Sequence, residues 1–261
     1  MAKYIYLNEN WTEFIWNDKE ISVLLAQVRN LQGRLLGKMS ALGFSLQTEA
    51  TLEMITLDIL KSSEIEGEKL NRAQVRSSIA RRLGIEVAGL VASAKNIDGI
   101  VEMMLDATQR YEQPLTEERM FGWHAALFPT GYSSGYKIDV ACYRKGDMQV
   151  VSGAMGKEKV HYEAVAAEKV KPEMDTLLKW LNAKNDNIDS VIKAALAHLW
   201  FVTIHPFDDG NGRIARAISD MLLTRSDERK QRFYSMSAQI LKERKKYYEA
   251  LEDHTKVSRF F

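Results

Sequence analysis

The segment Thr203–Arg216 reads TIHPFDDGNGRIAR, and it decides how the rest of the chain is interpreted. An apolar helix is expected to end before Pro206, because a proline disfavours helical geometry in the residue that precedes it. A tight loop over residues 208–212 then leads into a second helix, whose N-terminus offers unpaired N–H groups and the positive end of its dipole. Gly210 and Gly212 carry no Cβ, so a ligand can approach the backbone closely. The segment therefore predicts a phosphate-binding cradle.

Four side chains around this loop have the chemistry that phosphate transfer needs. Arg213 and Arg216 lie three residues apart on the expected helix, so both guanidinium groups can point toward one anion. Asp209 lies at the edge of the loop, where its carboxylate can hold Mg²⁺. His205 precedes the loop and can accept a proton near pH 7. Each feature is common on its own, but their order within one segment predicts a functional site.

The segment resembles the motif of the Fic family, His-x-Phe-x-(Asp/Glu)-Gly-Asn-Gly-Arg-x-x-Arg. This sequence matches every defined position of that motif, at His205, Phe207, Asp209, Gly210, Asn211, Gly212, Arg213 and Arg216. The resemblance extends to the helix before the motif and to residues 237–251, so residues 90–255 as a whole resemble a Fic core.

The resemblance implies a protein adenylyltransferase, which transfers AMP from ATP to a Ser, Thr or Tyr hydroxyl of a target protein or of the chain itself. His205 would deprotonate that hydroxyl, and Asp209 would hold Mg²⁺ on the α- and β-phosphates. The backbone of Gly210 to Gly212, with Asn211, would stabilise the transferred group. Arg213 and Arg216 would bind the outer phosphates.

The resemblance also implies an adenine site near the end of the chain. Tyr247 and Tyr248 resemble an aromatic pair near the end of many Fic cores, which would border the adenine.

A second motif lies upstream, where residues 62–67 read SSEIEG. They resemble the inhibitory motif of Fic proteins of the class II type, (Ser/Thr)-x-x-x-Glu-(Gly/Asn), which lies on a helix before the core. The resemblance implies that Glu66 pairs with Arg216 and competes with the γ-phosphate of ATP. Ser62 would support the helix end by hydrogen bonding, and Gly67 completes the motif.

Several alternatives remain open at this point. Glu64 and Glu68 flank Glu66, and only the motif selects Glu66 among them. In some similar proteins the same glutamate orients a water that removes AMP, so a phosphodiesterase that uses Glu66 is one alternative. A non-catalytic nucleotide-binding regulator is another, although the intact motif speaks against it. Transfer of UMP or phosphocholine would use the same phosphate chemistry.

Apolar residues at helical spacing dominate the rest of the sequence. They predict a long helix over residues 21–42, a second helix that ends at Gly67, and a third that starts at Asn71. Further helices are expected over residues 90–111, 117–127, 172–182, 190–203, 213–225 and 237–253. The 172–182 helix would carry Pro172 in its first turn, where proline is tolerated.

One region departs from this pattern. Residues 129–162 are rich in Gly, Ser and Tyr, and two short β-branched runs predict a β-hairpin at about residues 148–162. The hairpin would correspond to the family's flap, whose exposed edge can pair with an extended target segment. We therefore expect an all-α protein with one small hairpin. An N-terminal helical regulatory domain would occupy residues 1–89 and a Fic core residues 90–261.

Composition excludes several classes of protein. The 36 Lys and Arg nearly balance the 35 Asp and Glu, which argues against nucleic-acid binding through overall charge. A single cysteine, Cys142, excludes a disulfide framework and a multi-cysteine zinc site. Neither a signal peptide nor a membrane-spanning stretch is recognisable, so we expect a cytoplasmic protein. Dimerisation is common among similar proteins, and a homodimer is left open.

Overall fold

Two helices joined by the predicted motif form the centre of the molecule. In the computed structural model these are α7 (Ser190–Ile204) and α8 (Asn211–Asp227), which pack closely along their length. Residues 205–210 connect them and are called the motif loop below. The structure describes residues 4–152, 159–183 and 188–256.

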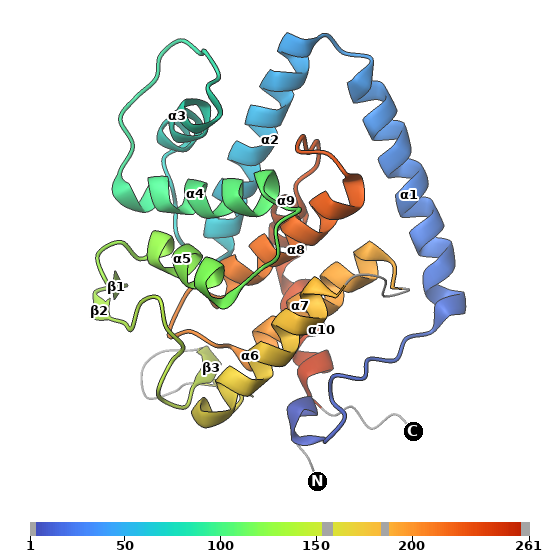
Figure 1. Cartoon of the computed structure of the whole chain (residues 1–261), viewed down its shortest axis with the longest axis vertical. Helices are drawn as coiled ribbons and strands as arrows, with labels where there is room; N and C mark the ends of the chain where they lie inside the picture. Colours follow the sequence, from blue (N-terminus) through green and yellow to red (C-terminus); the bar gives the residue numbers. More distant parts are fainter. Residues whose placement is uncertain (1–3, 153–158, 184–187, 257–261) are drawn as a thin grey trace.

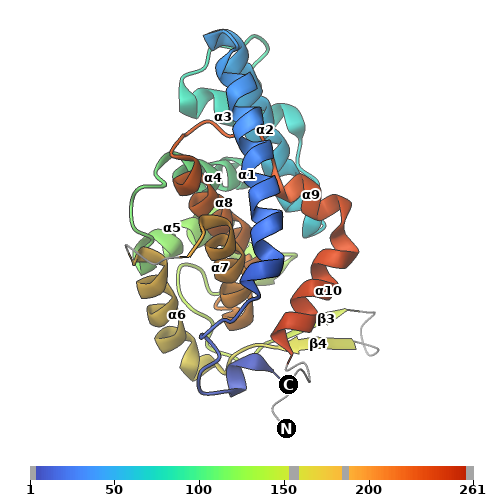
Figure 2. The same cartoon turned by 90° about the vertical axis from the view of Figure 1, so that its right-hand side faces the viewer.

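Eight further α-helices are found within those residues, together with one 3₁₀ turn and two antiparallel hairpins (Figures 1 and 2). The helices are α1 (Asp18–Ser40), α2 (Phe44–Ile65), α3 (Arg72–Leu83), α4 (Lys95–Gln109), α5 (Glu117–Leu127), α6 (Ala167–Asn182), α9 (Met236–Lys242) and α10 (Arg244–Thr255). The 3₁₀ turn is Ile5–Leu7, and the strands are β1 (Tyr132–Ser133), β2 (Tyr136–Lys137), β3 (Gln149–Ser152) and β4 (Lys159–Glu163). The mostly helical fold expected from the sequence is thus confirmed.

Local signals in the sequence start three of the helices, α3, α5 and α7, where they were expected. The side chain of Thr116 accepts a hydrogen bond from the backbone N–H of Arg119 at the start of α5. Asn71 caps α3 and Asp189 caps α7 in the same manner. Each of these caps satisfies a backbone donor that would otherwise lack a partner within the helix.

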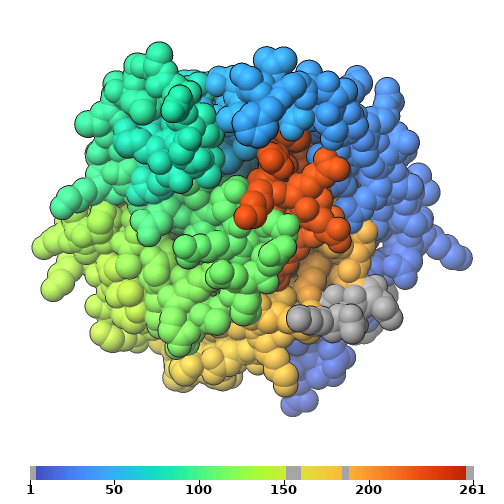
Figure 3. Space-filling model, turned by 45° about the horizontal axis from the view of Figure 1, so that its top comes forward, coloured from blue at the N-terminus to red at the C-terminus, as the bar shows by residue number. Residues whose placement is uncertain are grey.

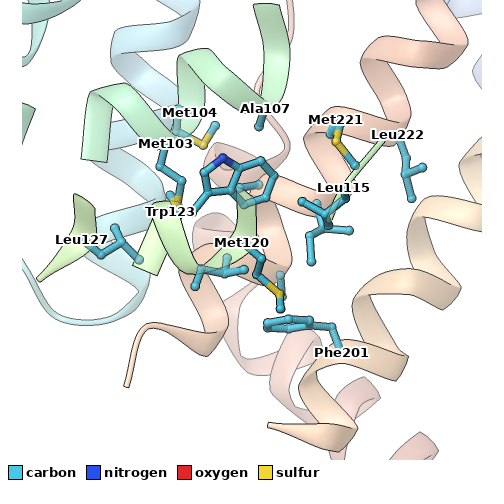
Figure 4. Close-up of a cluster of buried hydrophobic side chains, with 14 of the residues drawn as sticks. Met103, Met104, Ala107, Leu115, Met120, Trp123, Leu127, Phe201, Met221 and Leu222 are labelled. Carbon is cyan, nitrogen blue, oxygen red and sulfur yellow. The ribbon is translucent and has the colours of Figure 1, made fainter. Parts of the chain in front are cut away.

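The main core lies between α4, α5, α7 and α8. Figure 4 shows Trp123 of α5 among Met103 and Met104 of α4 and Met221 of α8, with Phe201 of α7 below them. All five side chains are buried. The α4–α5 crossing is close because a Cβ at Gly99 would lie 1.7 Å from the carbonyl oxygen of Ala126.

The N-terminal helices lie against this core. In Figure 3 the blue and teal surfaces of α1 to α3 meet the green surface of α4 and α5, with the orange-red segment after α8 between them. The α2 helix packs on α9 and α3 and buries Leu52, Ile55 and Ile59. This contact brings the C-terminal end of α2 to the motif loop.

The apolar spacing of α1 does not lead to burial in this chain. Val23, Leu24 and Leu31 are all about 60% exposed or more. The helix runs along one side of the molecule (Figure 1), and Arg29 ties it to the body by donating to Asp189 and Ser226. Helical spacing therefore predicted the helix but not what its apolar face contacts.

Three expected helix boundaries were wrong, each for a local reason. The α4 helix starts at Lys95 because residues 90–94 hydrogen-bond to side chains of α3 in place of helical partners. The α6 helix starts at Ala167, so Pro172 lies inside it, and buried apolar residues on both sides of the proline continue the helix. The expected last helix is two helices, because Glu243 leaves the helical conformation at φ −112° and ψ 33°.

The structure also contains a second hairpin that the sequence analysis missed. Strands β1 and β2 pair antiparallel through a two-residue turn at Ser134 and Gly135, both with positive φ. The predicted hairpin is present as β3 and β4, which pair antiparallel with a bulge between Val150 and Val151. Its glycines, Gly153 and Gly156, lie outside the described residues. No helix within the described ranges has the length and apolar character needed to cross a membrane.

Candidate active site

His205 lies at the point where α7 turns into the motif loop. It caps the C-terminus of α7 with a left-handed conformation, φ +53° and ψ +60°, which is uncommon for a residue other than glycine. The ring Nδ1 lies 3.2 Å from the carbonyl oxygen of Val202. A carbonyl can only accept, so Nδ1 carries the hydrogen and Nε2 is the basic nitrogen.

Burial lowers the pKa of His205 below its ordinary value, while the hydrogen bond to Val202 opposes that shift. The positive charge of Arg144 lowers the pKa further, and the carboxylates of Glu66 and Asp209 raise it. The net shift is downward, so His205 is neutral at pH 7. It can therefore accept a proton in the pH range in which a general base is needed.

The motif loop is fixed from inside by Asn211 and Phe207. The Asn211 side chain accepts from the N–H of Phe207 and donates to its carbonyl, at 3.0 and 2.7 Å. Since that side chain is buried, it positions the loop, and only the Asn211 backbone remains for the predicted cradle. Gly210 adopts φ +84° just before α8 begins, a conformation that favours glycine.

His124 of α5 supports the same loop, and the sequence analysis did not single it out. Its ring stacks on Phe207 with centroids 4.2 Å apart. Its Nδ1 accepts from the N–H of Ala141, so Nε2 carries the hydrogen and donates to the carbonyl of Asp209 at 3.1 Å. Burial lowers the pKa of His124 to about 4, which keeps the ring neutral. No local pattern around His124 could have indicated this contact, because Asp209 lies far along the chain.

Arg216, whose side chain is almost fully buried, forms an ion pair with the upstream motif. Its Nη2 lies 2.7 Å from Oε1 of Glu66, and its side chain is 1% exposed. Ser62 adds two contacts: its hydroxyl accepts from Nε and its carbonyl from Nη2, both at 2.9 Å. The structure thus brings Ser62, Glu66 and Arg216 together, as the resemblance implied.

The Glu66 carboxylate also covers the backbone at the start of α8. A Cβ placed on Gly212 would lie 2.2 Å from Oε1 of Glu66. A helix N-terminus attracts an anion through its free N–H groups and its dipole. The anion at this N-terminus is the carboxylate of Glu66.

Glu68 makes a second ion pair that the sequence did not resolve. Its Oε2 lies 3.0 Å from Nη1 of Arg213, whose side chain is 9% exposed. The guanidinium of Arg213 also lies over the ring of Phe128, at 5.1 Å. Both motif arginines are therefore neutralised by acids from the end of α2.

The local geometry of that helix end explains which acids reach α8. Gly67 has φ +85°, and the N–H groups of Gly67 and Glu68 donate to the carbonyls of Glu64 and Ser63. This is a Schellman motif, in which Glu66 is the C-cap and Glu68 the second residue beyond it. Glu64 remains in the last helical turn and pairs with Lys61 at 2.7 Å.

Asp209 lies at the edge of the cradle with 44% of its side chain exposed. Its Oδ2 accepts from the hydroxyl of Ser133 in the β1–β2 hairpin, and its Oδ1 from the N–H of Gly210. No group of three or more potential metal ligands occurs in the described part of the chain. A single exposed carboxylate beside a phosphate cradle still suits Mg²⁺, which usually takes one or two carboxylates, substrate phosphates and water.

Tyr247 and Tyr248 lie on α10, with ring centroids 5.2 Å apart. The Tyr247 hydroxyl and Nε2 of His198 are 2.7 Å apart, and burial raises the pKa of Tyr247 to about 12. Tyr248 is 41% exposed. Their contact with an adenine stays a prediction.

The β3–β4 hairpin adjoins α10 (Figure 2), and His161 Nδ1 lies 3.1 Å from Glu252 Oε2.

The buried histidines predict loss of stability in mild acid. The folded-state pKa is about 4 for His124 and about 3 for His198, against about 6.5 in an unfolded chain. Below pH 6.5 the unfolded state therefore binds protons that the folded state does not. Each histidine should reduce the free energy of unfolding by about 1.4 kcal/mol per pH unit in this range.

Urea unfolding at about pH 7.5 and pH 5.5 measures this effect. The His198→Gln variant should show a smaller difference between the two conditions than the wild type, because one depressed pKa is gone. The exposed His254→Gln serves as the control and should keep the full difference. Equal stability at both pH values in the wild type would contradict the prediction.

Two family models match separate parts of this chain. Residues 114–223 match the model of the Fic/DOC family. Residues 4–85 match a domain of unknown function, DUF4172. The first match contains the motif loop, and the second contains the Ser62–Glu66 segment.

The curated relatives include protein adenylyltransferases. The protein adenylyltransferase fic-1 of Caenorhabditis elegans is 38% identical over 66 residues, which are 25% of this chain and 13% of that protein. Protein adenylyltransferase Fic of Culex quinquefasciatus is 27% identical over 199 residues, 73% of this chain and 36% of that protein. The aligned region is therefore only a small to moderate part of each relative.

A solved structure shows that the fold is shared. A Fic family protein from Desulfovibrio desulfuricans superimposes with a TM-score of 0.65 at 24% identity. The superposition covers 91% of this chain and 67% of that one.

Proposed function

Because this chain carries a Fic/DOC family domain, we propose that it is an autoinhibited protein adenylyltransferase, which transfers AMP from ATP to a hydroxyl side chain of a protein. The curated relatives named as adenylyltransferases support the reaction class. One observation carries the inhibited state: the 2.7 Å ion pair of Arg216 with Glu66, whose carboxylate covers the start of α8.

The reaction follows from the positions of the side chains. Nε2 of His205 takes the proton of the target hydroxyl as the hydroxyl oxygen attacks the α-phosphorus of ATP. A new phosphorus–oxygen bond forms, the bond to the bridging oxygen of the β-phosphate breaks, and pyrophosphate leaves. Charge builds up on the phosphate oxygens during this transfer, and the N–H groups at the start of α8 stabilise it. Mg²⁺ held by Asp209 would neutralise the phosphates.

Inhibition follows from competition for the same groups. The γ-phosphate of ATP needs the guanidinium of Arg216, which already has Glu66 as its counter-ion. Likewise, Arg213 already has the carboxylate of Glu68 as its counter-ion. A nucleotide must displace these carboxylates or bind with its phosphates misplaced, and transfer then fails because phosphoryl transfer depends on positioning.

The target would enter beside the β3–β4 hairpin. This two-stranded sheet offers a strand edge, to which an extended peptide can add by main-chain hydrogen bonds. Such pairing would present a hydroxyl side chain to His205 without demanding a particular sequence.

ATP labelled in its α-phosphate tests the reaction class directly. Label should pass to protein in the Glu66→Gly variant with Mg²⁺, whereas label in the γ-phosphate should not. Transfer of γ-label would identify a kinase, and binding of ATP without any transfer would favour a regulator.

Glu68 should contribute a smaller part of the inhibition than Glu66. Its pair with Arg213 is partly exposed, so it is worth about 0.4–1 kcal/mol. Glu68→Gln should therefore tighten ATP binding roughly two- to fivefold, measured by calorimetry. Glu64→Gln is the matched control, because Glu64 pairs with Lys61 on the same helix end, and it should leave the affinity unchanged. Equal effects of the two variants would refute a specific role of Glu68.

A further inference from the structure

The carbonyl groups at the end of α7 all have partners, and most partners come from outside the motif. A helix leaves its last carbonyls without intrahelical donors, so these groups need other partners. Val202 is bound by the ring of His205, and Thr203 by the hydroxyl of Tyr162 at 2.7 Å. The next three carbonyls, of Ile204, His205 and Pro206, all accept from a single residue, Arg144.

Arg144 binds them with its side chain and its backbone together. Its Nε donates to the carbonyl of His205 at 2.8 Å, and Nη2 donates to that of Ile204 at 3.3 Å. Its own backbone N–H donates to the carbonyl of Pro206 at 2.9 Å. Arg144 is only 3% exposed, so these contacts are shielded from water. They surround the residue that holds the strained left-handed conformation.

The same guanidinium binds the chain where it enters the β3–β4 hairpin and where it leaves it. Nη1 donates to the carbonyl of Gly146, just before β3, at 2.7 Å. Nη2 also donates to the carbonyl of Val165, just after β4. No carboxylate takes part in these contacts, so Arg144 brings a buried positive charge to a cluster of carbonyl dipoles.

We propose that Arg144 is a positioning residue, which fixes the orientation of the His205 ring and joins it rigidly to the β3–β4 hairpin where the target docks. This inference rests on the proposed function for its consequence in catalysis, but the geometry on which it is built does not. A hydroxyl carried by a target on the hairpin then arrives at a fixed distance from Nε2 of His205. Small misplacements of reacting groups cost large factors in rate, so such a link matters.

Besides burial, the positive charge of Arg144 lowers the pKa of His205, which is the direction that a free base needs. A nearby positive charge disfavours the protonated ring and so keeps the base free near pH 7. Glu66 and Asp209 are the carboxylates that act in the opposite direction. Arg144 therefore supplies both the geometry and part of the protonation state of the base.

Three variants separate these two contributions. Arg144→Gln removes both the positive charge and the guanidinium with its several N–H donors. Arg144→Lys keeps the charge but also loses the guanidinium. Arg225→Gln is the matched control, because Arg225 also donates to main-chain carbonyls, those of Tyr111, Gln113 and Leu181. It lies twelve residues after Arg213 on α8, about 18 Å along the helix axis.

The first readout needs no catalysis. Titration of ¹⁵N-labelled histidine by NMR, with the His205 signal assigned from His205→Ala, should show a higher pKa of His205 in Arg144→Gln. It should show nearly the wild-type pKa in Arg144→Lys and in Arg225→Gln. Amide exchange at residues 148–150 and 160–163 should become faster in both Arg144 variants than in Arg225→Gln.

The second readout is transfer in the Glu66→Gly background. Both Arg144 variants should lower kcat roughly 10- to 100-fold with ATP affinity within about twofold of the parent. An unchanged His205 titration in Arg144→Gln, or exchange and kcat no different from Arg225→Gln, would overturn the proposal. If the Glu66→Gly parent itself transfers nothing, the proposed function fails, while the titration and exchange still decide the role of Arg144.

Discussion

Glu66→Gly should raise the rate of AMP transfer at subsaturating ATP by roughly 10- to 100-fold. The ion pair with Arg216 is a charge-assisted contact, and such contacts contribute about 1.5–3 kcal/mol when protected from water. Glu66 itself is 34% exposed, and solvent screening moves the expected effect toward the lower end of that range. The gain should come mainly from phosphate binding at Arg216, so it should shrink as ATP approaches saturation.

The same substitution should destabilise the chain when no nucleotide is present. Arg216 would keep its contacts with Ser62 but lose its counter-ion, and an uncompensated buried charge is costly. Addition of ATP should restore a partner to the guanidinium. The thermal midpoint of Glu66→Gly should therefore lie below that of the wild type without ATP, and rise more than the wild type with it.

Glu64→Gly provides the control for this experiment. It places the same glycine in the last turn of α2 and removes a carboxylate that pairs with Lys61. Its transfer rate should equal that of the wild type. Unchanged or lower transfer in Glu66→Gly would contradict the inhibitory role of Glu66. If that variant also lost the ability to remove AMP from a modified protein, Glu66 would be assigned to the reverse reaction.

His205→Ala should reduce transfer by roughly 10²- to 10⁴-fold in the Glu66→Gly background. Alanine removes the group that takes the proton from the target hydroxyl but leaves the N–H groups at the start of α8 and both motif arginines. Binding of ATP, measured by calorimetry, should stay within about threefold of the parent. A residual rate above a tenth of the parent rate would rule His205 out as the base.

The pH dependence of transfer gives an independent test of the base. His205 acts as a base only when it is neutral, and burial lowers its pKa below the ordinary value of about 6.5. The rate should therefore be nearly constant around pH 7 and fall only when the pH drops through the lowered pKa. Folding must be checked at each acidic pH, because His124 and His198 reduce stability in the same direction. A midpoint well above 6.5 would contradict this assignment.

Features carried by neighbouring residues could be predicted from the sequence. The helix starts at Asn71, Thr116 and Asp189, and the glycine at the end of α2, rest on contacts within a few residues of each other. Asn-Gly at 211–212 likewise fits a tight entry into α8. Such contacts depend on side-chain chemistry and chain geometry that are already fixed by the local sequence.

The acids around Glu66 show where prediction from the sequence stopped. Glu64, Glu66 and Glu68 have the same charge and lie on one short stretch, so composition does not distinguish them. The Schellman motif turns the chain after Ile65, and the resemblance selected Glu66, but only the packing of α2 against the core shows that Glu68 also faces α8. The role of Glu68 was missed for this reason.

By itself, the sequence determined where most of the helices lie, the caps of α3, α5 and α7, the glycine-bearing start of α8 and the residue types at the phosphate cradle. Tertiary structure alone decided that Glu68 meets Arg213, that His124 supports Asp209 and that Arg144 holds the turn at His205. These pairs are separated by 61 to 145 residues, and no periodicity extends over such a distance. Their contacts form only when buried polar groups find partners as the helices pack.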